Sequence, residues 1–372
     1  MACVLNHDTC DPLSCPPTVP RSHINVRNTM PTDIATGFTL RGSAGARRSV
    51  LAILGAAALF VAPRPAAALT ITPTFTAAFV SNFGANAVDA ENAWIAAANV
   101  FQTNFSDPIH INITVNAVAG TSVFGQSNLP IRTVSYANLR AFDLADVKTA
   151  DDATATGAGG SVAATDPVSG THTWAVSRAE AKALGLIPDD LTNDGTTTFG
   201  AGNPFTFAGP IAAGTFDFQG IAAHEISEVM GRLGLMKNTN SYSMADLFTY
   251  SAAGTRGGAF IGPCPSTSSN DFFSIDNGQT LLKKENDYCA NGLDVDDWAP
   301  GTNDSFNQFS RSGVVNAVTE VDLRQMDVLG YDRVVATPEP STLALTVIGL
   351  VAVGAAGFRR RQKRRAVLLL YA

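Results

Sequence analysis

The sequence predicts a mixed α+β domain, and three kinds of pattern along the chain favour this class. Ala87 to Phe105 is rich in alanine with large apolar residues interspersed, which predicts a helix packed on one side. Ile109 to Val115 alternates apolar and polar residues, the pattern of a half-buried strand. Phe216 to Leu233 and Thr319 to Leu329 have their apolar residues at helical spacing. We therefore expect one compact unit of helices and strands over residues 69–336.

Local signals indicate the shorter elements between these. Residues 150–170 are rich in Asp, Thr, Gly and Ala without periodicity, which predicts a long surface loop. Ser177 and Glu180 have the spacing of a capping box, and Gly185 is placed to close the short helix that this box would begin. Residues 196–208 carry phenylalanines among Thr and Gly, which weakly indicates a strand.

The composition is that of a globular protein and argues against a nucleic-acid-binding one. The chain has 372 residues, of which 45% are hydrophobic, and a formal net charge of −7. Basic residues concentrate at the two ends, so that residues 69–337 hold 13 Lys and Arg against 28 Asp and Glu, a net charge of −15. So acidic a body disfavours nucleic acid and anionic membrane surfaces as partners.

Residues 1–68 are predicted to contain an export signal. Arg47 and Arg48 precede an apolar run from Ser49 to Pro63, and Ala66-Ala67-Ala68 forms a small-residue cleavage site for signal peptidase. The run is too short and too flanked by proline to favour a permanent membrane span. The mature chain is therefore expected to begin at Leu69.

The cysteines divide into two sets. Three of them lie in residues 1–29, a polar, Pro-rich segment that precedes Met30, a plausible true start of translation. Cys264 and Cys289 remain in the exported body, where an oxidising compartment favours a disulfide that closes a loop of about 25 residues. Two buried free thiols are the alternative.

The C-terminus predicts a second envelope signal. A proline linker at 337–342 leads into an apolar run, Leu343 to Phe358, and then into a basic cluster at 359–365, followed by a tail at 366–372. This order indicates a short transmembrane helix with a positive stop on the cytoplasmic side. It closely resembles the PEP-CTERM sorting domain, which implies that residues 337–365 are a sorting segment. An exosortase would cut at its Pro-Glu-Pro region and pass the protein to the outer surface or extracellular matrix. A plain membrane anchor is the alternative.

The chemistry of the chain is indicated by one helix, in the stretch Ala223 to Arg232. His224 and Glu228 keep the i, i+4 spacing of the H-E-x-x-H zinc motif, with Glu228 in place of the second histidine. A carboxylate is an acceptable zinc ligand, and Glu225 occupies the general-base position. A surface charge pair is the alternative. It is disfavoured because the helix is apolar nearly all round, so the carboxylates would be buried without compensation unless a cation were bound.

A catalytic zinc site usually has three protein ligands, and the helix supplies two. The continuation found in H-E-x-x-H-x-x-G-x-x-H proteases would place the third at Gly234, which has no side chain. Our choice is Asp246, a short loop beyond the helix, although it could equally be a turn or capping residue. Tyr250 could donate a hydrogen bond to an oxyanion, or it could be an aromatic of the core.

Several segments taken together resemble a bacterial PEP-CTERM-associated metalloprotease family of zincin type. They are His224 to Arg232, Asp246 to Ser251, Phe273 to Gly278, Asp297-Trp298 and Leu329 to Asp332. The resemblance spans most of Ala87 to Asp332. It implies a zincin-like fold and an exported peptidase, with His224, Glu225 and Glu228 in the matching positions of the motif.

We therefore expect an exported zinc-dependent metalloendopeptidase that acts on protein or peptide substrates. Zinc would lower the pKa of a bound water, and Glu225 would take its proton and pass it to the leaving amine. One alternative is a non-catalytic surface or matrix protein of the same fold that binds a structural cation, and another is a cation-stabilised adhesive or glycan-binding module. Calcium or manganese are alternative ions, and a calcium site could lie in the region of the following acidic residues: Asp271, Asp276, Asp287, Asp294, Asp296 and Asp297.

Overall fold

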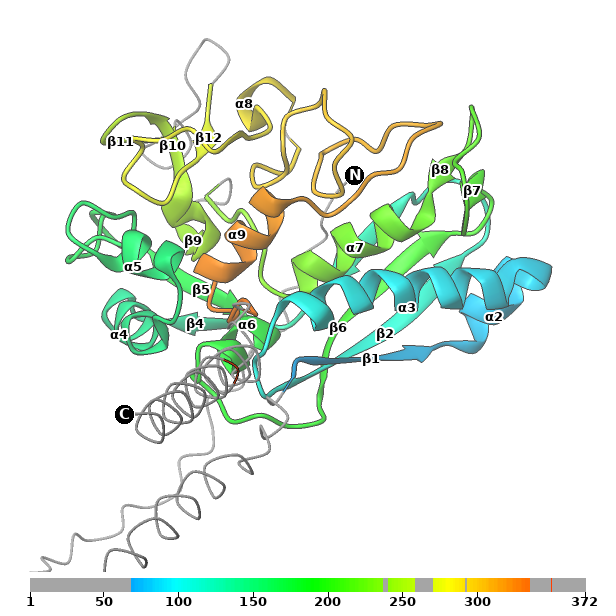
Figure 1. Ribbon diagram of the computed structural model, residues 1–372, viewed down its shortest axis with the longest axis horizontal. Helices are drawn as coiled ribbons and strands as arrows, with labels where there is room; N and C mark the ends of the chain where they lie inside the picture. Colours follow the sequence, from blue (N-terminus) through cyan, green and yellow to red (C-terminus); the bar gives the residue numbers. More distant parts are fainter. Residues whose placement is uncertain (1–67, 237–239, 258–269, 292, 335–348, 350–372) are drawn as a thin grey trace, which may run out of the picture. The chain divides into compact units, whose positions relative to one another are not determined.

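A four-stranded mixed sheet with helices on one face forms the centre of the molecule (Figure 1). The computed structural model describes residues 68–236, 240–257, 270–291, 293–334 and 349. The strand order is β1-β2-β6-β3, in which the first three strands run parallel and β3 pairs antiparallel at the edge. The bounds are β1 Thr70–Phe75, β2 His110–Val118, β6 Asn193–Gly200 and β3 Gly125–Asn128. The α+β class predicted from the sequence is confirmed.

The alternation in β2 shows why this strand lies at the centre. Ile111, Ile113 and Val115 are buried, while Asn112 and Thr114 between them are partly exposed. One face of the strand therefore packs on the core and the other faces outward, as the period of two predicted. The register places Val115 opposite Thr197 of β6 and Phe75 opposite Val115 on the β1 side.

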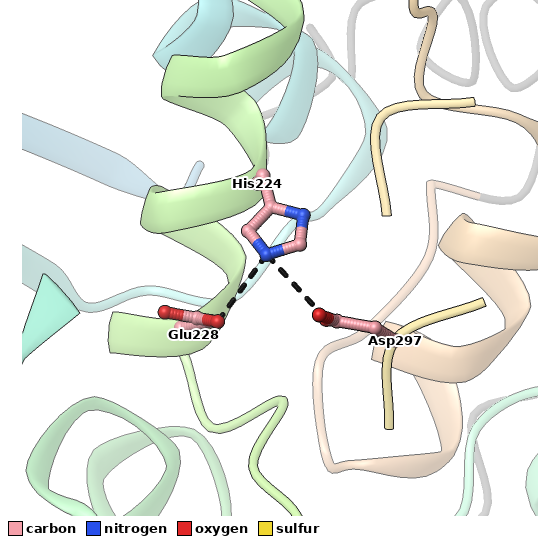
Figure 2. A group of neighbouring side chains, drawn as sticks. All are labelled: His224, Glu228 and Asp297. Atoms are coloured by element: carbon pink, nitrogen blue, oxygen red, sulfur yellow. Dashed lines mark ion pairs between the residues drawn. The ribbon is translucent and has the colours of Figure 1, made fainter. Parts of the chain in front are cut away.

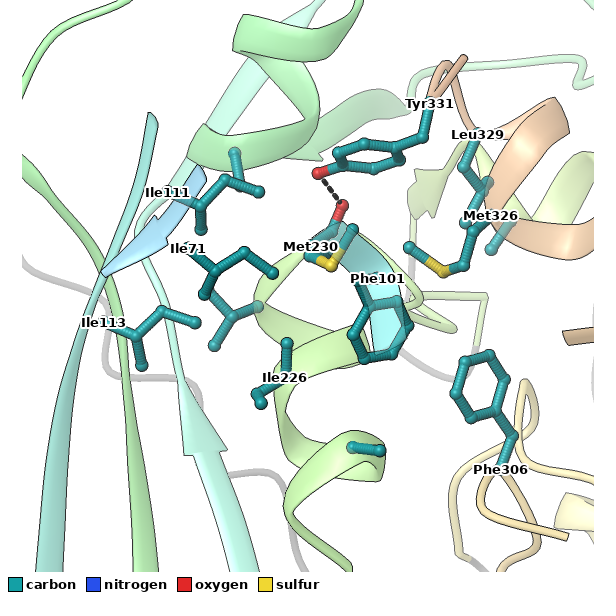
Figure 3. Packing of buried hydrophobic residues seen from close by; sticks show 14 of the residues in the cluster. Ile71, Phe101, Ile111, Ile113, Ile226, Met230, Phe306, Met326, Leu329 and Tyr331 are labelled. Atoms are coloured by element: carbon teal, nitrogen blue, oxygen red, sulfur yellow. Dashed lines mark hydrogen bonds between the residues drawn. The ribbon is translucent and has the colours of Figure 1, made fainter. Parts of the chain in front are cut away.

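Helices α3 (Ala87–Asn104) and α7 (Phe218–Val229) pack side by side over this sheet (Figure 1). The predicted helix at 87–105 is thus confirmed. Alanines on the buried face of α3 let α7 approach closely, and the ring of Phe101 stacks on that of Phe306, in the segment between α8 and α9. Ile226 and Met230 point from α7 toward Ile71 and the isoleucines of β2 (Figure 3). Burial of these large apolar side chains is what fixes α7 on the sheet.

Smaller elements surround this centre. A three-stranded sheet has the order β4-β5-β9, a second four-stranded sheet has the order β11-β10-β12-β13, and β7 pairs with β8. Their bounds are β4 Ile131–Val134, β5 Thr173–Ser177, β9 Ser241–Ser243, β10 Thr249–Ala252, β11 Thr255–Arg256, β12 Phe272–Phe273, β13 Lys283–Lys284, β7 Phe205–Thr206 and β8 Phe216–Asp217. The remaining helices are α2 Ala77–Phe83, η1 Gly84–Asn86, α4 Tyr136–Asp146, α5 Ala150–Thr156, α6 Arg178–Ala183, η2 Ala245–Phe248, α8 Tyr288–Asn291 and α9 Glu320–Val328.

The helix ends test the capping signals. Ser177 caps α6 and forms the predicted reciprocal capping box with Glu180. The loop predicted over residues 150–170 is wrong for its first seven residues, which form α5. The reason is a second capping box, between Thr149 and Asp152, which stabilises a helix start in a stretch that has no apolar periodicity.

The end of the described chain is tied to the ends of the two central helices. The hydroxyl of Tyr331 donates to the backbone carbonyl of Met230 at 2.7 Å (Figure 3). The backbone N–H of Val334 donates to the carbonyl of Asn104 at 2.8 Å, and that of Ser106 donates to the carbonyl of Asp332 at 2.8 Å. These bonds join the segment after α9 to the C-terminal ends of α3 and α7.

Several sequence predictions lie outside the described residues. These are the export signal, apart from Ala68, the sorting segment with its transmembrane helix, and Cys264. Cys289 is disulfide-bonded, while its pairing with Cys264 stays a prediction. No helix in the described part of the chain combines the length and apolar character that a membrane span requires.

Candidate metal centre

Helix α7 presents the predicted site residues on neighbouring turns. Asp217 stands at its N-cap position, where a carboxylate interacts favourably with the helix dipole. Glu225 is 3% exposed and Glu228 7% exposed, so both carboxylates are buried as the apolar character of the helix predicted. His224 is partly exposed, with 14% of its side chain accessible, and is therefore the solvent-facing member of the group.

His224 lies between two carboxylates from distant parts of the chain (Figure 2). Its Nε2 atom is 3.3 Å from Oε1 of Glu228 and 3.4 Å from Oδ1 of Asp297. On the other side of the ring, Nδ1 lies 2.9 Å from the backbone carbonyl of Ser305. That carbonyl can only accept, so Nδ1 carries a proton, and Nε2 is the atom available to bind a cation.

These distances fit a tetrahedral ion. Zinc–ligand bonds of about 2.0–2.1 Å at tetrahedral angles separate neighbouring ligand atoms by roughly 3.4 Å. The two separations at His224 match this value, and the ligand atoms of His224, Glu228 and Asp297 all lie within 4.8 Å of one another. One imidazole and two carboxylates suit zinc better than calcium, which prefers oxygen ligands alone.

The electrostatics of the group are those of a closely balanced ion-pair cluster. Burial alone lowers the pKa of His224, but the carboxylates of Asp297 and Glu228 raise it to about 9. Burial likewise opposes ionisation of Glu228, yet His224 and the guanidinium of Arg232 hold its pKa at about 2. At neutral pH Glu228 is therefore a carboxylate, the form that binds a metal, while His224 carries a proton on Nε2 that a metal would have to displace.

Glu225 lies within hydrogen-bonding reach of Glu228 and against the edge strand. A Cβ built on Gly125 of β3 would lie 2.2 Å from Oε1 of Glu225, so the strand leaves room for this side chain only because residue 125 is glycine. Burial, followed by the negative charge of Glu228, raises the pKa of Glu225 well above its usual range. Among the described groups at this site, Glu225 is the carboxyl poised to hold a proton.

The edge strand also supports Glu228. The hydroxyl of Ser127, in β3, donates to Oε2 of Glu228 at 2.5 Å, and both groups are buried. This bond leaves Oε1 as the oxygen that faces His224. Partners that orient a ligand in this way commonly change metal affinity by 10–100-fold when they are removed.

The structure places Asp297, and not Asp246, beside His224 and Glu228. Asp246 is fully buried, and its Oδ2 accepts hydrogen bonds from the backbone N–H groups of Ser243 at 2.7 Å and Leu235 at 3.2 Å. Its role is to fix the turn that follows α7, which is the capping alternative that the sequence left open. It is therefore removed from the ligand set.

Tyr250 is likewise a core aromatic. It is fully buried in β10, and the guanidinium of Arg256 covers its ring at 4.7 Å from the centroid. We therefore assign it no part in the chemistry of the group around His224.

Three residues near His224 were not assigned to the site from the sequence. Asp297 lies 69 positions beyond Glu228. From the sequence it was named among several acidic residues of a Gly/Asn-rich region and in the Asp297-Trp298 segment of the family resemblance, but not as a ligand. Its position is set by Trp298, which is fully buried and donates from Nε1 to Asp322 at 2.6 Å. An acidic residue next to a buried tryptophan is the only local signal for it. Arg232 ends the motif segment His224 to Arg232 but was given no role there, and Ser127 carried no signal.

No calcium site emerges from the part of the chain that the structure describes. The group His224, Glu228 and Asp297 is the one set of three or more potential ligands found close together among these residues. A calcium site therefore stays a prediction. A separate cavity of about 220 Å³ lies beside the first turn of α7, between Val100, Phe207 and Val315, and the three residues of the group do not line it.

Comparison with known proteins identifies one segment. Residues 336–364 match the PEP-CTERM protein-sorting motif, as predicted for 337–365. No curated protein and no solved structure matches the chain. The motif implies export, processing by an exosortase and sorting to the cell surface through a membrane anchor.

Proposed function

We propose that this chain is an exported zinc-dependent metalloendopeptidase with a zincin-like active site. The observation that carries the proposal is the group formed by His224, Glu228 and Asp297, with Glu225 next to it on the same helix. In this arrangement a three-residue ligand set lies beside a buried carboxyl able to move a proton. The sorting motif supports an extracellular location for the enzyme.

Each of the three residues would bind zinc through one atom. His224 would bind zinc through Nε2, held in orientation by the carbonyl of Ser305, and Glu228 and Asp297 would bind through one carboxylate oxygen each. A bound zinc ion supplies a Lewis acid that polarises the substrate carbonyl and acidifies water. The residues themselves contribute orientation and exclude bulk water, since Glu228 and Asp297 are almost fully buried.

Glu225 would act as the general base and then as the general acid. It is held against β3, where Gly125 leaves space for its carboxylate. It would accept the proton of the attacking water and donate it to the leaving amine. Glu225 must be a carboxylate to accept this proton, and its raised pKa then favours holding the proton until the leaving amine takes it.

The deciding experiment is zinc analysis of the purified protein and of Asp297→Asn, with Asp246→Asn as the matched control. Both aspartates are buried, so loss of fold would affect the two variants alike. We expect near-stoichiometric zinc in the parent and in Asp246→Asn, and strongly reduced zinc in Asp297→Asn. Casein hydrolysis should follow the zinc content and should also be lost in Glu225→Gln, which keeps the ligands.

A second candidate is a non-catalytic surface protein in which this cluster is purely structural. It is favoured by one observation, namely that His224 and Arg232 can neutralise Glu228 and Asp297 without any metal. A metal-free parent protein with full thermal stability would establish this candidate and remove the peptidase proposal. A zinc-loaded parent that is inert toward peptides would leave the structural-cation form of it.

A further inference from the structure

Arg232 is a buried cation directly behind the proposed ligands. Its side chain is 1% exposed, and its Nη1 donates to Oδ1 of Asp297 at 2.6 Å and to the backbone carbonyl of Asp296 at 3.2 Å. Its Nη2 lies 3.8 Å from Oε1 of Glu228. The two carboxylate oxygens that approach Nε2 of His224 are thus the same two that Arg232 approaches from behind.

Neighbouring groups hold Arg232 in this place. Its Nε donates to the hydroxyl of Ser227 at 2.8 Å, and that hydroxyl donates to the backbone carbonyl of His224 at 2.6 Å. Its guanidinium carbon lies 4.5 Å from the ring centroid of Phe306. The guanidinium is held on three sides and is shielded from water. Its charge therefore acts on the ligands with less solvent screening than the charge of a surface arginine would.

The charge matters because of the unusual ligand set. Zinc bound by two histidines and one carboxylate, the set of several zinc peptidases, keeps a net charge of about +1. Replacing the second histidine by Glu228 would reduce that charge to about zero and make the ion a weaker Lewis acid. One additional positive charge in contact with both carboxylates restores the balance of the two-histidine site.

We propose that Arg232 is a positioning residue that offsets the second carboxylate ligand, so that the His224, Glu228 and Asp297 set keeps the net charge of a two-histidine, one-carboxylate zinc site. The inference rests on the proposed function. It adds that Arg232 lowers the zinc affinity of the site in exchange for keeping a bound ion electrophilic. A residue with a merely structural role would have the opposite effect on affinity, because its loss would disorder the ligands.

The test is zinc affinity, measured by competition with a chromophoric chelator for the parent, Arg232→Gln and Arg232→Lys. Removal of a buried charge in contact with the ligands should increase zinc affinity about tenfold in Arg232→Gln, while peptide hydrolysis falls. Arg232→Lys keeps the charge and should stay within about twofold of the parent. Arg324→Gln, which removes an arginine paired with Asp151 at the surface, is the control and should change neither property.

Opposite results overturn the inference. Weaker zinc binding in Arg232→Gln with an intact fold by circular dichroism, or equal affinity gains in the Gln and Lys variants, would show that Arg232 does not act through its charge. A parent protein that binds no zinc would instead remove the proposed function itself.

If Arg232→Gln fails to fold, the same substitution is made in Glu228→Gln. The double variant has lost one charge of each sign and leaves no unpaired buried charge at these two positions. Glu228→Gln/Arg232→Gln should bind zinc several-fold more tightly than Glu228→Gln alone, because Arg232 still contacts Asp297 when residue 228 is neutral. The gain need not equal that in the parent, since neighbouring charges are coupled. Equal zinc affinities for these two variants would refute the charge role.

Discussion

Gly125 and Gly195 offer a paired test of where Glu225 lies and what it does. Both glycines belong to the central sheet and face α7. A Cβ on Gly125 would meet Oε1 of Glu225 at 2.2 Å, whereas a Cβ on Gly195 would meet the two Cγ atoms of Val229 at 2.7 and 2.8 Å. The first substitution crowds the proposed base, and the second crowds a side chain of the core on the same helix.

The structure predicts that Gly125→Ala mainly lowers activity and that Gly195→Ala mainly lowers stability. The carboxylate of Glu225 ends a flexible side chain that can rotate away, so Gly125→Ala should cost only about 1 kcal/mol of stability. The displacement would nevertheless exceed about 1 Å, which is enough to reduce catalysis about 100-fold. Val229 is β-branched and cannot rotate freely, so Gly195→Ala should cost about 2–3 kcal/mol and leave hydrolysis within a few-fold of the parent.

The assay is kcat/KM for a quenched fluorescent peptide, taken beside thermal melts and zinc content for both variants. Zinc should remain bound in each, since neither glycine contacts a ligand residue. Full activity in Gly125→Ala would refute the position or the role assigned to Glu225. An equal fall in both variants would mean that activity simply follows stability.

Three further predictions concern the surroundings of the site and the chain as a whole. Ser127→Ala removes the hydrogen bond to Glu228 and should weaken zinc binding by 10–100-fold in a chelator titration; an unchanged affinity would contradict the orienting role. Burial raises the pKa of Asp107 to about 7, so the native state retains a proton that the unfolded state loses above about pH 4. The contribution of Asp107 to stability is therefore greatest below about pH 4 and falls until about pH 7, and Asp107→Asn should raise stability at pH 8 by about 1–2 kcal/mol in urea melts, with no gain at pH 4. Cys289→Ser should lower stability by about 2–4 kcal/mol, and non-reducing peptide mapping should show the pairing with Cys264; a free Cys264 in the parent would exclude it.

The sequence predicted those parts of the fold and site that depend on local patterns. The spacing of apolar residues located α3 and α7, and the motif on α7 placed His224, Glu225 and Glu228 on neighbouring turns because helical geometry is a short-range property. The burial of the two glutamates followed from the apolar residues around them.

The rest depended on contacts between residues far apart in the chain. Asp297 reaches His224 only because the loop after α8 packs across α7, and no spacing in the sequence encodes that crossing. Asp246 was the nearest acidic residue after the helix, and proximity in sequence was a poor guide, since its carboxylate fixes a backbone turn. Arg232 was overlooked because its role arises from two carboxylates that meet only in the folded state.

The hydrogen bonds that join the segment after α9 to the ends of α3 and α7 determine the length of the linker between the domain and its sorting signal. Val334 is held to Asn104, and the sorting motif begins two residues later, at 336. Four residue steps from Val334 to Pro338 can span at most about 14 Å. If an exosortase cuts at the start of the Pro-Glu-Pro segment, the cut cannot lie farther than this span from Val334. Loss of the hydrogen bond between Tyr331 and Met230 would lengthen this linker. The rate of release from the membrane should therefore depend on how stably the segment after α9 is held to the domain.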